Sequence, residues 1–287
     1  MNKFNQKMQD QSIIIGDGAM GTRLQARGLK SGEVSEVWNL EYPEKVAAVH
    51  REYIEAGADL IETNSFGGNY IRLKEQNLQD KFKEINCTAV EIAKSAAPKE
   101  TIIAGSVGPT GKMLKPLGEL APEEAYKGYK KQIEILVNNG VDLLIIETMT
   151  DLKEMEQALK AADEFDTPAV AQMNFTSAGK TVMGDGIEEA AEIIEKYNAD
   201  VAGINCTPGM SETVPLISKL NEATDLPLST FPNAGSPRLE GGNISYPEGP
   251  EDYVAGLEEL VNNNVRIIGG CCGSDPLIIA AISDYFR

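Results

Sequence analysis

The alternation of short apolar runs with amphipathic stretches is the sequence feature that most constrains the fold. The runs are rich in β-branched residues and lack strict two-residue alternation, which is typical of parallel strands covered on both faces. Eight of them occur, at 12–18, 58–64, 101–108, 141–148, 168–175, 199–206, 226–233 and 265–272. Each run therefore predicts one buried strand.

Helical patterns fill most of the intervals between these runs. Pro near the start, or Gly or Asn near the end, marks several of them. The predicted helices span 43–57, 78–97, 121–140, 151–165, 186–199, 211–223, 249–264 and 274–286. The stretch 23–42 predicts a mixture of helix and loop.

Eight strand-and-helix units in 287 residues predict an α/β chain that folds as one (β/α)₈ TIM barrel over residues 1–287. Barrels of this kind have about 250 residues. A doubly wound open sheet is the alternative. No GxGxxG follows the first run, which counts against a dinucleotide-binding version of that sheet.

The charge balance limits the partners. The chain has 44 acidic and 26 basic residues, for a formal charge of −18, and such a surface repels nucleic acid and anionic lipid. The N-terminal residues do not resemble a signal peptide, and no apolar run approaches the length of a membrane span. We therefore expect a cytoplasmic protein. In that reducing compartment, cysteine clusters indicate metal binding or catalysis more often than disulfides.

Polar or metal-binding side chains stand at the ends of nearly all the predicted strands. In a TIM barrel these ends meet at the active site. In chain order the residues are Asp17, Glu62, Asn64, Ser106, Glu147, Asn174, Asn205, Cys206, Asn233, Cys271 and Cys272. We expect their side chains to converge on one cavity.

Three cysteines from two of these strand ends predict a zinc site. Cys206 ends the sixth strand, and Cys271 and Cys272 end the eighth. Three thiolates can occupy three corners of a Zn²⁺ tetrahedron and leave the fourth for a substrate, which is the catalytic arrangement. Zinc deprotonates a bound thiol, so this site favours a reaction in which a thiol is the nucleophile.

Other interpretations of these residues stay open. The adjacent Cys271 and Cys272 could instead be two buried apolar side chains or a vicinal disulfide in a redox or non-catalytic protein. Cys87 lies in a helical stretch and predicts a packed thiol. His50, the only histidine, lies midway along a predicted helix and predicts a structural or surface role.

Carboxylates at two strand ends suit the recognition of an ammonium group. Asp17 and Glu147 could hold a substrate α-amino group by charge-assisted hydrogen bonds, although Asp17 could also cap a helix and Glu147 could form a structural ion pair. The GAMG turn at 18–21 offers backbone N–H groups for a carboxylate. An amino-acid thiol is therefore the expected guest.

Seven motifs in order along the chain resemble those of the homocysteine S-methyltransferase family. They are GDGAMGT (16–22), ETNSFGGN (62–69), GSVGPTG (105–111), ET (147–148), GINC (203–206), PNAG (232–235) and GGCCG (269–273). The likeness is greatest to the N-terminal homocysteine-binding module of cobalamin-dependent methionine synthase. Thr148 stands where the betaine-using branch has Tyr, which argues against betaine as the donor.

The resemblance implies a role for each site residue. Cys206, Cys271 and Cys272 would hold one zinc ion per chain. Asp17 and Glu147 would bind the homocysteine amino group. The substrate carboxylate would bind backbone amides near Ala19 and Met20, Asn233 would occupy the fourth zinc position until the thiol displaces it, and Glu62 and Asn64 would line or support the pocket.

The implied reaction is transfer of a methyl group to the thiolate of homocysteine, giving methionine. No stretch of the chain resembles a cobalamin-binding or folate-binding module. The expected donor is therefore a methylcorrinoid on a separate protein or module, which this chain does not bind by itself. A small sulfonium donor, S-methylmethionine or S-adenosylmethionine, is the alternative, as is a different thiol acceptor.

Overall fold

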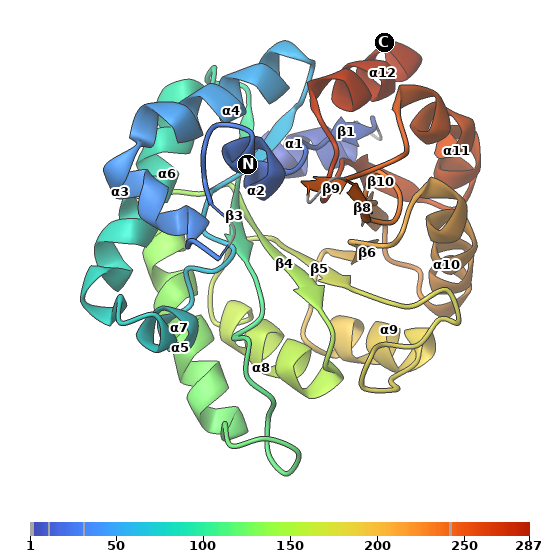
Figure 1. The fold of residues 1–287 in the computed structure, drawn as a ribbon. Helices are drawn as coiled ribbons and strands as arrows, with labels where there is room; N and C mark the ends of the chain where they lie inside the picture. Colours follow the sequence, from blue (N-terminus) through green and yellow to red (C-terminus); the bar gives the residue numbers. More distant parts are fainter. Residues whose placement is uncertain (1–2, 11, 31, 241–242) are drawn as a thin grey trace.

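Eight parallel strands form a nearly closed barrel in a computed structural model that describes residues 3–10, 12–30, 32–240 and 243–287 (Figure 1). Neighbouring strands follow the order β1-β10-β7-β6-β5-β4-β3-β2. Their bounds are β1 Ile14–Ile15, β2 Leu60–Glu62, β3 Ile102–Val107, β4 Leu143–Met149, β5 Ala169–Met173, β6 Val201–Asn205, β7 Leu228–Phe231 and β10 Val265–Ile268. Each lies inside one of the eight apolar runs, except that β4 extends one residue further, to Met149. The predicted TIM barrel is therefore confirmed, and the open sheet is not formed.

Helices surround the barrel (Figure 1). The eight predicted ones are α4 Pro43–Glu55, α6 Phe82–Ala96, α7 Pro122–Asn138, α8 Leu152–Ala162, α9 Ile187–Lys196, α10 Met210–Ala223, α11 Pro250–Asn262 and α12 Pro276–Phe286. The mixed stretch 23–42 contains the end of α2 (Met20–Gln25) and α3 (Trp38–Glu41), and the short α5 (Tyr70–Glu75) was not predicted. Among the described residues, no helix has both the length and the apolarity to cross a membrane.

The seam between β1 and β2 closes without a regular strand ladder. Near the start of the strands, the Asp59 N–H donates to the Ile15 carbonyl (2.7 Å). At the other end, the Glu62 N–H donates to Asp17 Oδ2 (3.0 Å). A side-chain carboxylate thus takes the place of a backbone acceptor, which fixes Asp17 at the mouth of the barrel.

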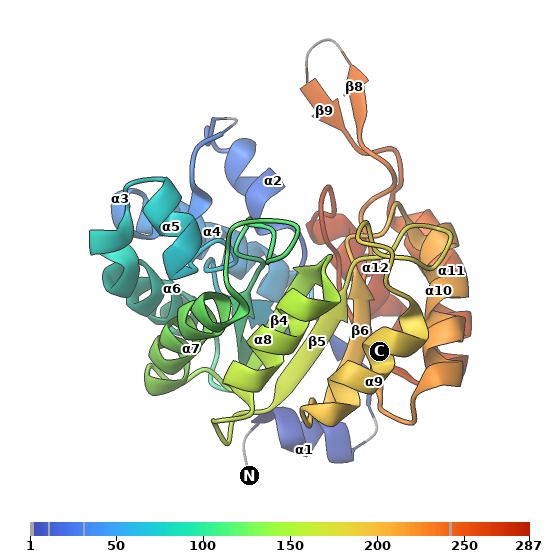
Figure 2. The ribbon, with the colours of Figure 1, turned by 90° about the horizontal axis from the view of Figure 1, so that it is seen from below.

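The opposite end of the barrel is covered by α1 (Lys3–Gln9) (Figure 2). Phe4 is 1% exposed and packs with Ile14, Leu60 and Ile102 in the cluster that fills the barrel interior. Lys7 pairs with Asp59 (2.5 Å). This helix was not predicted, because Phe4 and Met8 are the only large apolar residues in its two turns, too few to show a helical period.

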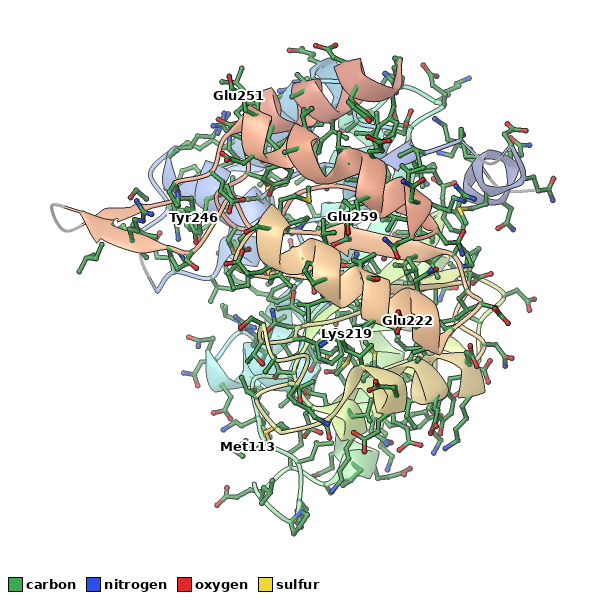
Figure 3. The ribbon with its side chains drawn as sticks, turned by 90° about the vertical axis from the view of Figure 1, so that its right-hand side faces the viewer. Met113, Lys219, Glu222, Tyr246, Glu251 and Glu259 are labelled. Atoms are coloured by element: carbon green, nitrogen blue, oxygen red, sulfur yellow. A yellow bond between two sulfur atoms is a disulfide. The ribbon has the colours of Figure 1, made fainter. Side chains whose placement is uncertain are left out.

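A two-stranded antiparallel hairpin, β8 (Arg238–Glu240) and β9 (Asn243–Ser245), projects from the end of the barrel opposite α1 (Figure 2). It lies in the connection after β7 and was not predicted either. Tyr246 follows β9, where the hairpin joins the barrel (Figure 3). Its ring packs on Gly273, where a Cβ would collide with the ring and where φ is +82°, so this position favours glycine.

Candidate active site and metal centre

A cavity of about 300 Å³ opens at the C-terminal ends of the strands, near the small end of the usual range for ligand sites. Nine of the ten predicted site residues line it: Asp17, Ala19, Met20, Glu62, Asn64, Glu147, Cys206, Cys271 and Cys272. Asn233 is not among the lining residues, although its side chain contacts the Cys206 carbonyl (3.1 Å). Of the eleven strand-end side chains expected to converge on one cavity, eight line it, and Asn174, Asn205 and Asn233 do not.

The three cysteines predicted to share a metal lie together. Their sulfur atoms are all within 4.8 Å of one another. Cys206 and Cys271 form a disulfide, with Cα atoms 5.5 Å apart, and Cys272 is a free thiol. The vicinal pairing of Cys271 with Cys272, considered from the sequence, is therefore not the one formed.

Backbone hydrogen bonds to the connection after β7 hold both cysteine segments. The Cys206 N–H donates to the Phe231 carbonyl (2.9 Å), and the Cys271 N–H donates to the Pro232 carbonyl (2.7 Å). The Ala234 N–H in turn donates to the Cys272 carbonyl (2.9 Å). The backbone at the end of β7 thus holds Cys206, which follows β6, beside Cys271 and Cys272, which follow β10.

The donor set fits a zinc ion. At a Zn–S distance of about 2.3 Å, tetrahedral ligation places ligand sulfurs about 3.8 Å apart, and the three sulfurs lie within 4.8 Å of one another. Cys206 and Cys271 are joined as a disulfide here, so this bond must be reduced before all three sulfurs can bind the ion as thiolates. Soft thiolates suit zinc better than they suit magnesium or calcium. Burial raises the pKa of the Cys272 thiol above its ordinary value, so in the absence of a cation this thiol tends to stay protonated.

Asn233 has one free oxygen beside this cluster. Its Nδ2 donates to the Cys206 carbonyl (3.1 Å), which fixes the orientation of the amide. Its Oδ1 is buried and has no hydrogen-bond partner among the described residues. A buried acceptor without a partner is unusual, and an oxygen ligand for a cation is the role that the sequence resemblance implied.

Carboxyl groups also line the cavity, and no described lining residue is basic. Glu147 Oε1 accepts from Ser106 Oγ (2.5 Å), and its Oε2 accepts from Asn205 Nδ2 (3.2 Å). Asp17 is 3% exposed. Glu62 Oε1 is buried and, within the described ranges, has no partner. The cavity therefore offers carboxyl groups as acceptors, and its described lining residues supply no cation to pair with them.

Electrostatics agree with this description. Burial raises the pKa of Asp17 well above its usual value, although the Glu62 N–H bond opposes the change. Burial, and then the neighbouring charges of Glu147 and Asp17, raise the pKa of Glu62 well above normal. Burial also raises the pKa of Glu147, against its side-chain hydrogen bonds. An entering ammonium group would favour the ionised forms of all three.

The raised pKa of Glu62 predicts a pH-dependent stability difference. A carboxyl whose pKa is higher in the folded chain contributes stability below its unfolded pKa and loses it as pH rises through the folded pKa. Without homocysteine, Glu62→Gln should therefore unfold at the wild-type temperature near pH 4.5 and a few degrees higher at pH 8. Thermal unfolding of both proteins across this range measures it. The exposed Glu55→Gln is the control, and a constant offset at every pH would contradict the assignment.

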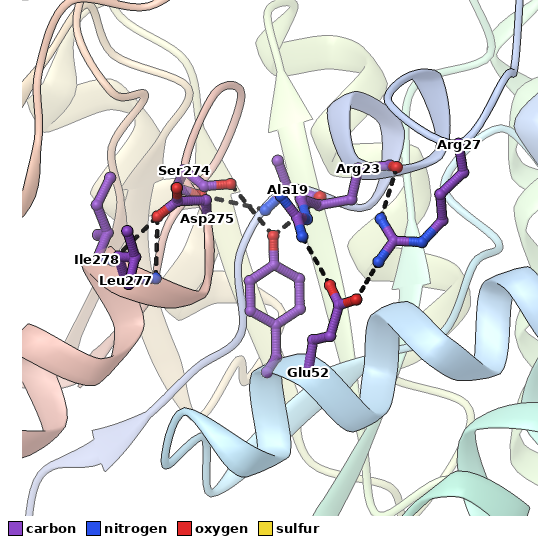
Figure 4. Close-up of polar contacts among 9 residues, drawn as sticks. Ala19, Arg23, Arg27, Glu52, Ser274, Asp275, Leu277 and Ile278 are labelled. Atoms are coloured by element: carbon purple, nitrogen blue, oxygen red, sulfur yellow. Dashed lines mark hydrogen bonds and ion pairs between the residues drawn. The ribbon is translucent and has the colours of Figure 1, made fainter.

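The first connection after β1 carries the predicted carboxylate-binding amides. The Ala19 N–H already donates to Ser274 Oγ (3.1 Å) (Figure 4). Met20 begins α2, and the first N–H groups of a helix have no partner within the helix. Thr22 Oγ1 is also buried without a partner in the described chain. The amide of Met20 and the Thr22 hydroxyl are therefore better placed to receive a carboxylate than the Ala19 amide.

Ion pairs outside the cavity anchor this same connection. Glu52 on α4 accepts from Arg23 (2.7 Å) and also binds Arg27 (Figure 4). The Tyr53 hydroxyl donates to the carbonyls of Ala19 (3.0 Å) and Ser274 (3.2 Å). These contacts fix the connection against α4 and the turn after β10.

Asn64 lines the cavity, but its side-chain amide donates hydrogen bonds to other residues of the chain. Its Nδ2 donates to the Ser35 carbonyl and to Asn39 Oδ1, both at 2.9 Å. Residues 35–39 lie within the stretch 23–42, for which the sequence predicted a mixture of helix and loop. Asn64 thus holds that stretch beside the cavity, which agrees with a supporting role in the pocket.

His50 and Cys87, which were expected to have no part in the site, both lie outside the cavity. His50 is 0% exposed in α4, and burial lowers its pKa to about 4, so a structural role agrees with its environment. Cys87 is half-buried on α6, where its sulfur accepts from Asn139 Nδ2 (3.4 Å). Neither lines the cavity.

Similarity to known proteins agrees with this site. A family model described as homocysteine S-methyltransferase matches residues 14–286. The chain belongs to the homocysteine S-methyltransferase family. Within that family, the methionine synthases of Mycobacterium leprae and Mycobacterium tuberculosis are 30% and 29% identical to it, over 93% and 95% of this chain. The chain spans only 24% of the length of each of these relatives.

A solved homocysteine S-methyltransferase superposes on the whole chain. The metallated form of the homocysteine methyltransferase MmuM from Escherichia coli has a TM-score of 0.83 at 25% identity, and each chain covers 99% of the other. Its oxidized form gives a TM-score of 0.82 at 26% identity, again over 99% of each chain. The barrel, with its additional helices and connections, is therefore the fold of this family.

Proposed function

We propose that this chain transfers a methyl group to the thiol sulfur of homocysteine, giving methionine, at a zinc ion held by Cys206, Cys271 and Cys272. The observation that carries the proposal is one small cavity that is lined by two chemically different groups of side chains. Three of them are cysteines whose sulfurs lie within 4.8 Å of one another, and three are carboxyl groups, of Asp17, Glu62 and Glu147. Homocysteine has a thiol and an ammonium group to match them.

The cysteines supply the metal side of the site. When bound, zinc lowers the pKa of a coordinated thiol and so provides a thiolate nucleophile at neutral pH. After a thiol reductant has opened the Cys206–Cys271 disulfide, Cys206, Cys271 and Cys272 would take three ligand positions. Asn233 Oδ1, which is buried without a described partner, would take the fourth in the absence of substrate.

The carboxylates supply orientation. Asp17 and Glu147 would accept hydrogen bonds from the substrate ammonium group, and the Met20 amide and Thr22 hydroxyl would bind its carboxylate. Holding both ends of the amino acid fixes the sulfur between the cysteines and the cavity mouth. The substrate sulfur would bind as a thiolate, with the thiol proton released to solvent, and would form a bond to the methyl carbon as the bond from that carbon to the donor breaks.

We propose a methylcorrinoid on a separate protein or module as the donor, since the relatives at 30% identity are methionine synthases about four times as long as the matched part. A small sulfonium donor is the second candidate. It is supported by the end-to-end match to a homocysteine methyltransferase of similar length.

A donor panel tests the proposal. Zinc-loaded protein is incubated with homocysteine and, separately, with free methylcobalamin, S-methylmethionine or S-adenosylmethionine, and methionine is measured. Methionine from methylcobalamin is the expected result, and Cys206→Ser is the matched inactive variant. Methionine from a sulfonium alone would replace the proposed donor. If zinc-loaded protein gives no methionine in any arm, the proposed activity is wrong.

A further inference from the structure

Two residues beside the cavity have backbone conformations that their side chains disfavour. Five non-glycine residues in the described chain have positive φ. Three of them are Asn residues that follow helices, which is a common arrangement. The other two are Thr148 (φ 59°) and Cys206 (φ 53°). A β-branched residue in this region is a rare outlier that the surrounding structure must hold in place.

One side chain accounts for the conformation of Thr148. Asn205, the last residue of β6, reaches past the end of β5 to β4. Its Oδ1 accepts from the Thr148 N–H (2.9 Å), and its Nδ2 donates to Thr148 Oγ1 (2.8 Å). The same Nδ2 donates to Glu147 Oε2 (3.2 Å). A single amide therefore fixes both the peptide after Glu147 and the carboxylate of Glu147.

Two further asparagines fix the next residue, Cys206. Asn174 at the end of β5 donates from Nδ2 to the carbonyls of Asn205 (3.0 Å) and Cys206 (2.9 Å). Asn233, after β7, donates to the same Cys206 carbonyl (3.1 Å). The Thr148 hydroxyl also lies 3.8 Å from Cys206 Sγ. We call Asn174, Asn205 and Asn233 the asparagine clamp.

We infer that Asn205 is a positioning residue that fixes the spacing between the Glu147 carboxylate and the Cys206 sulfur, and thereby couples the ammonium side of the cavity to the metal side. The inference rests on the proposed function, because it assigns substrate binding to Glu147 and metal binding to Cys206. Asn205 itself touches neither the metal nor the substrate in this account.

The physical reason is the strained peptide. Without the Asn205 bonds, Thr148 would relax toward a conformation with negative φ, because left-handed backbone is unfavourable for a β-branched residue. That relaxation turns the peptide after Glu147 and moves the Glu147 carboxylate and the Thr148 hydroxyl together. Since the Glu147 carboxylate lines the cavity and the Thr148 hydroxyl contacts Cys206 Sγ, the ammonium contact and the cysteine cluster would lose their alignment together.

Binding and metal release in the zinc-loaded protein test the inference. For Asn205→Ala we expect the Kd of homocysteine, measured by calorimetry, to rise about tenfold. We also expect zinc transfer to a chelator to become about tenfold faster. Both effects follow from the loss of the hydrogen bonds to Glu147 and Thr148 and of the positive φ of Thr148 that these bonds support. Asn205→Ala/Thr148→Gly should recover much of both losses, because glycine adopts positive φ without support. Asn198→Ala is the control, since Asn198 also has positive φ and loses one side-chain bond, to Asp163.

A thiol-free probe tests the coupling directly. L-2-aminobutyrate carries the ammonium and carboxylate groups but no metal ligand. L-2-aminobutyrate should slow zinc transfer from the wild type to the chelator about threefold. It should leave the rate of zinc transfer from Asn205→Ala unchanged, because coupling between the two sites is lost with the residue that connects them. If Asn205→Ala does not fold, the isosteric Asn205→Asp replaces it. That variant keeps the acceptor for the Thr148 N–H but lacks the donor to Glu147, and about threefold weaker homocysteine binding is expected.

The outcomes separate the two levels of the account. If the wild type binds no homocysteine, the proposed function is wrong. If the wild type binds homocysteine while the Asn205 variant binds it equally and releases zinc at the same rate, the inference is wrong. Equal slowing by L-2-aminobutyrate in both proteins, or failure of Thr148→Gly to restore binding in a folded double variant, would also overturn it.

Discussion

Cys206→Ser is expected to lower the zinc content from about one ion per chain to a small fraction of that, and to reduce methionine formation by on the order of 1,000-fold. Serine is nearly isosteric, but its hydroxyl stays protonated and is a poor zinc ligand. Metal analysis of purified protein and a single-turnover assay with the preferred donor measure the two effects.

Cys87→Ser provides the matched control for this change. Cys87 is a free cysteine on α6 that contacts Asn139 rather than the cavity. Its variant should retain both zinc and activity. Stoichiometric zinc in Cys206→Ser, or equal zinc loss in the two variants, would contradict the assignment of Cys206 as a ligand.

Glu147→Gln is expected to raise the KM for homocysteine by on the order of 100-fold while the zinc content stays near one per chain. The amide keeps the size of the side chain but removes the charge that pairs with the substrate ammonium group, and breaking one partner of a buried charge pair costs about 2–5 kcal/mol. Steady-state kinetics and metal analysis on the same preparation measure the two quantities.

A thiol without an ammonium group sharpens this test. 3-Mercaptopropanoate should be a poor acceptor for the wild type, and Glu147→Gln should narrow the ratio of kcat/KM between homocysteine and this analogue. Glu156→Gln is a suitable control, because Glu156 pairs with Lys196 outside the cavity. An unchanged ratio would show that Glu147 does not recognise the ammonium group.

The barrel could be predicted from the sequence because strands buried on both faces require apolar residues throughout. The runs around Leu143–Met149 and Val201–Asn205 show this most clearly, since all their residues but Thr148 are buried. The site could be predicted for a related reason. Residues at strand ends reach one cavity in this architecture, so Cys206 and Cys271 are brought together although 65 positions separate them in sequence.

Other features depend on tertiary contacts that leave little trace in the sequence. Phe4 is the single deeply buried residue described in α1, so no periodic pattern of apolar residues predicts that helix. Thr148 favours extended backbone by its branching, yet it has a positive φ, and its N–H donates to Asn205 on a strand distant in sequence. The engagement of the Ala19 amide by Ser274 likewise joins residues from opposite ends of the chain.

X-ray absorption at the zinc edge tests the central claim most directly. The zinc-loaded protein should show three sulfur ligands at about 2.3 Å and one lighter ligand, and addition of homocysteine should give four sulfurs. A zinc environment with fewer than three sulfurs, or one that homocysteine leaves unchanged, would contradict the account.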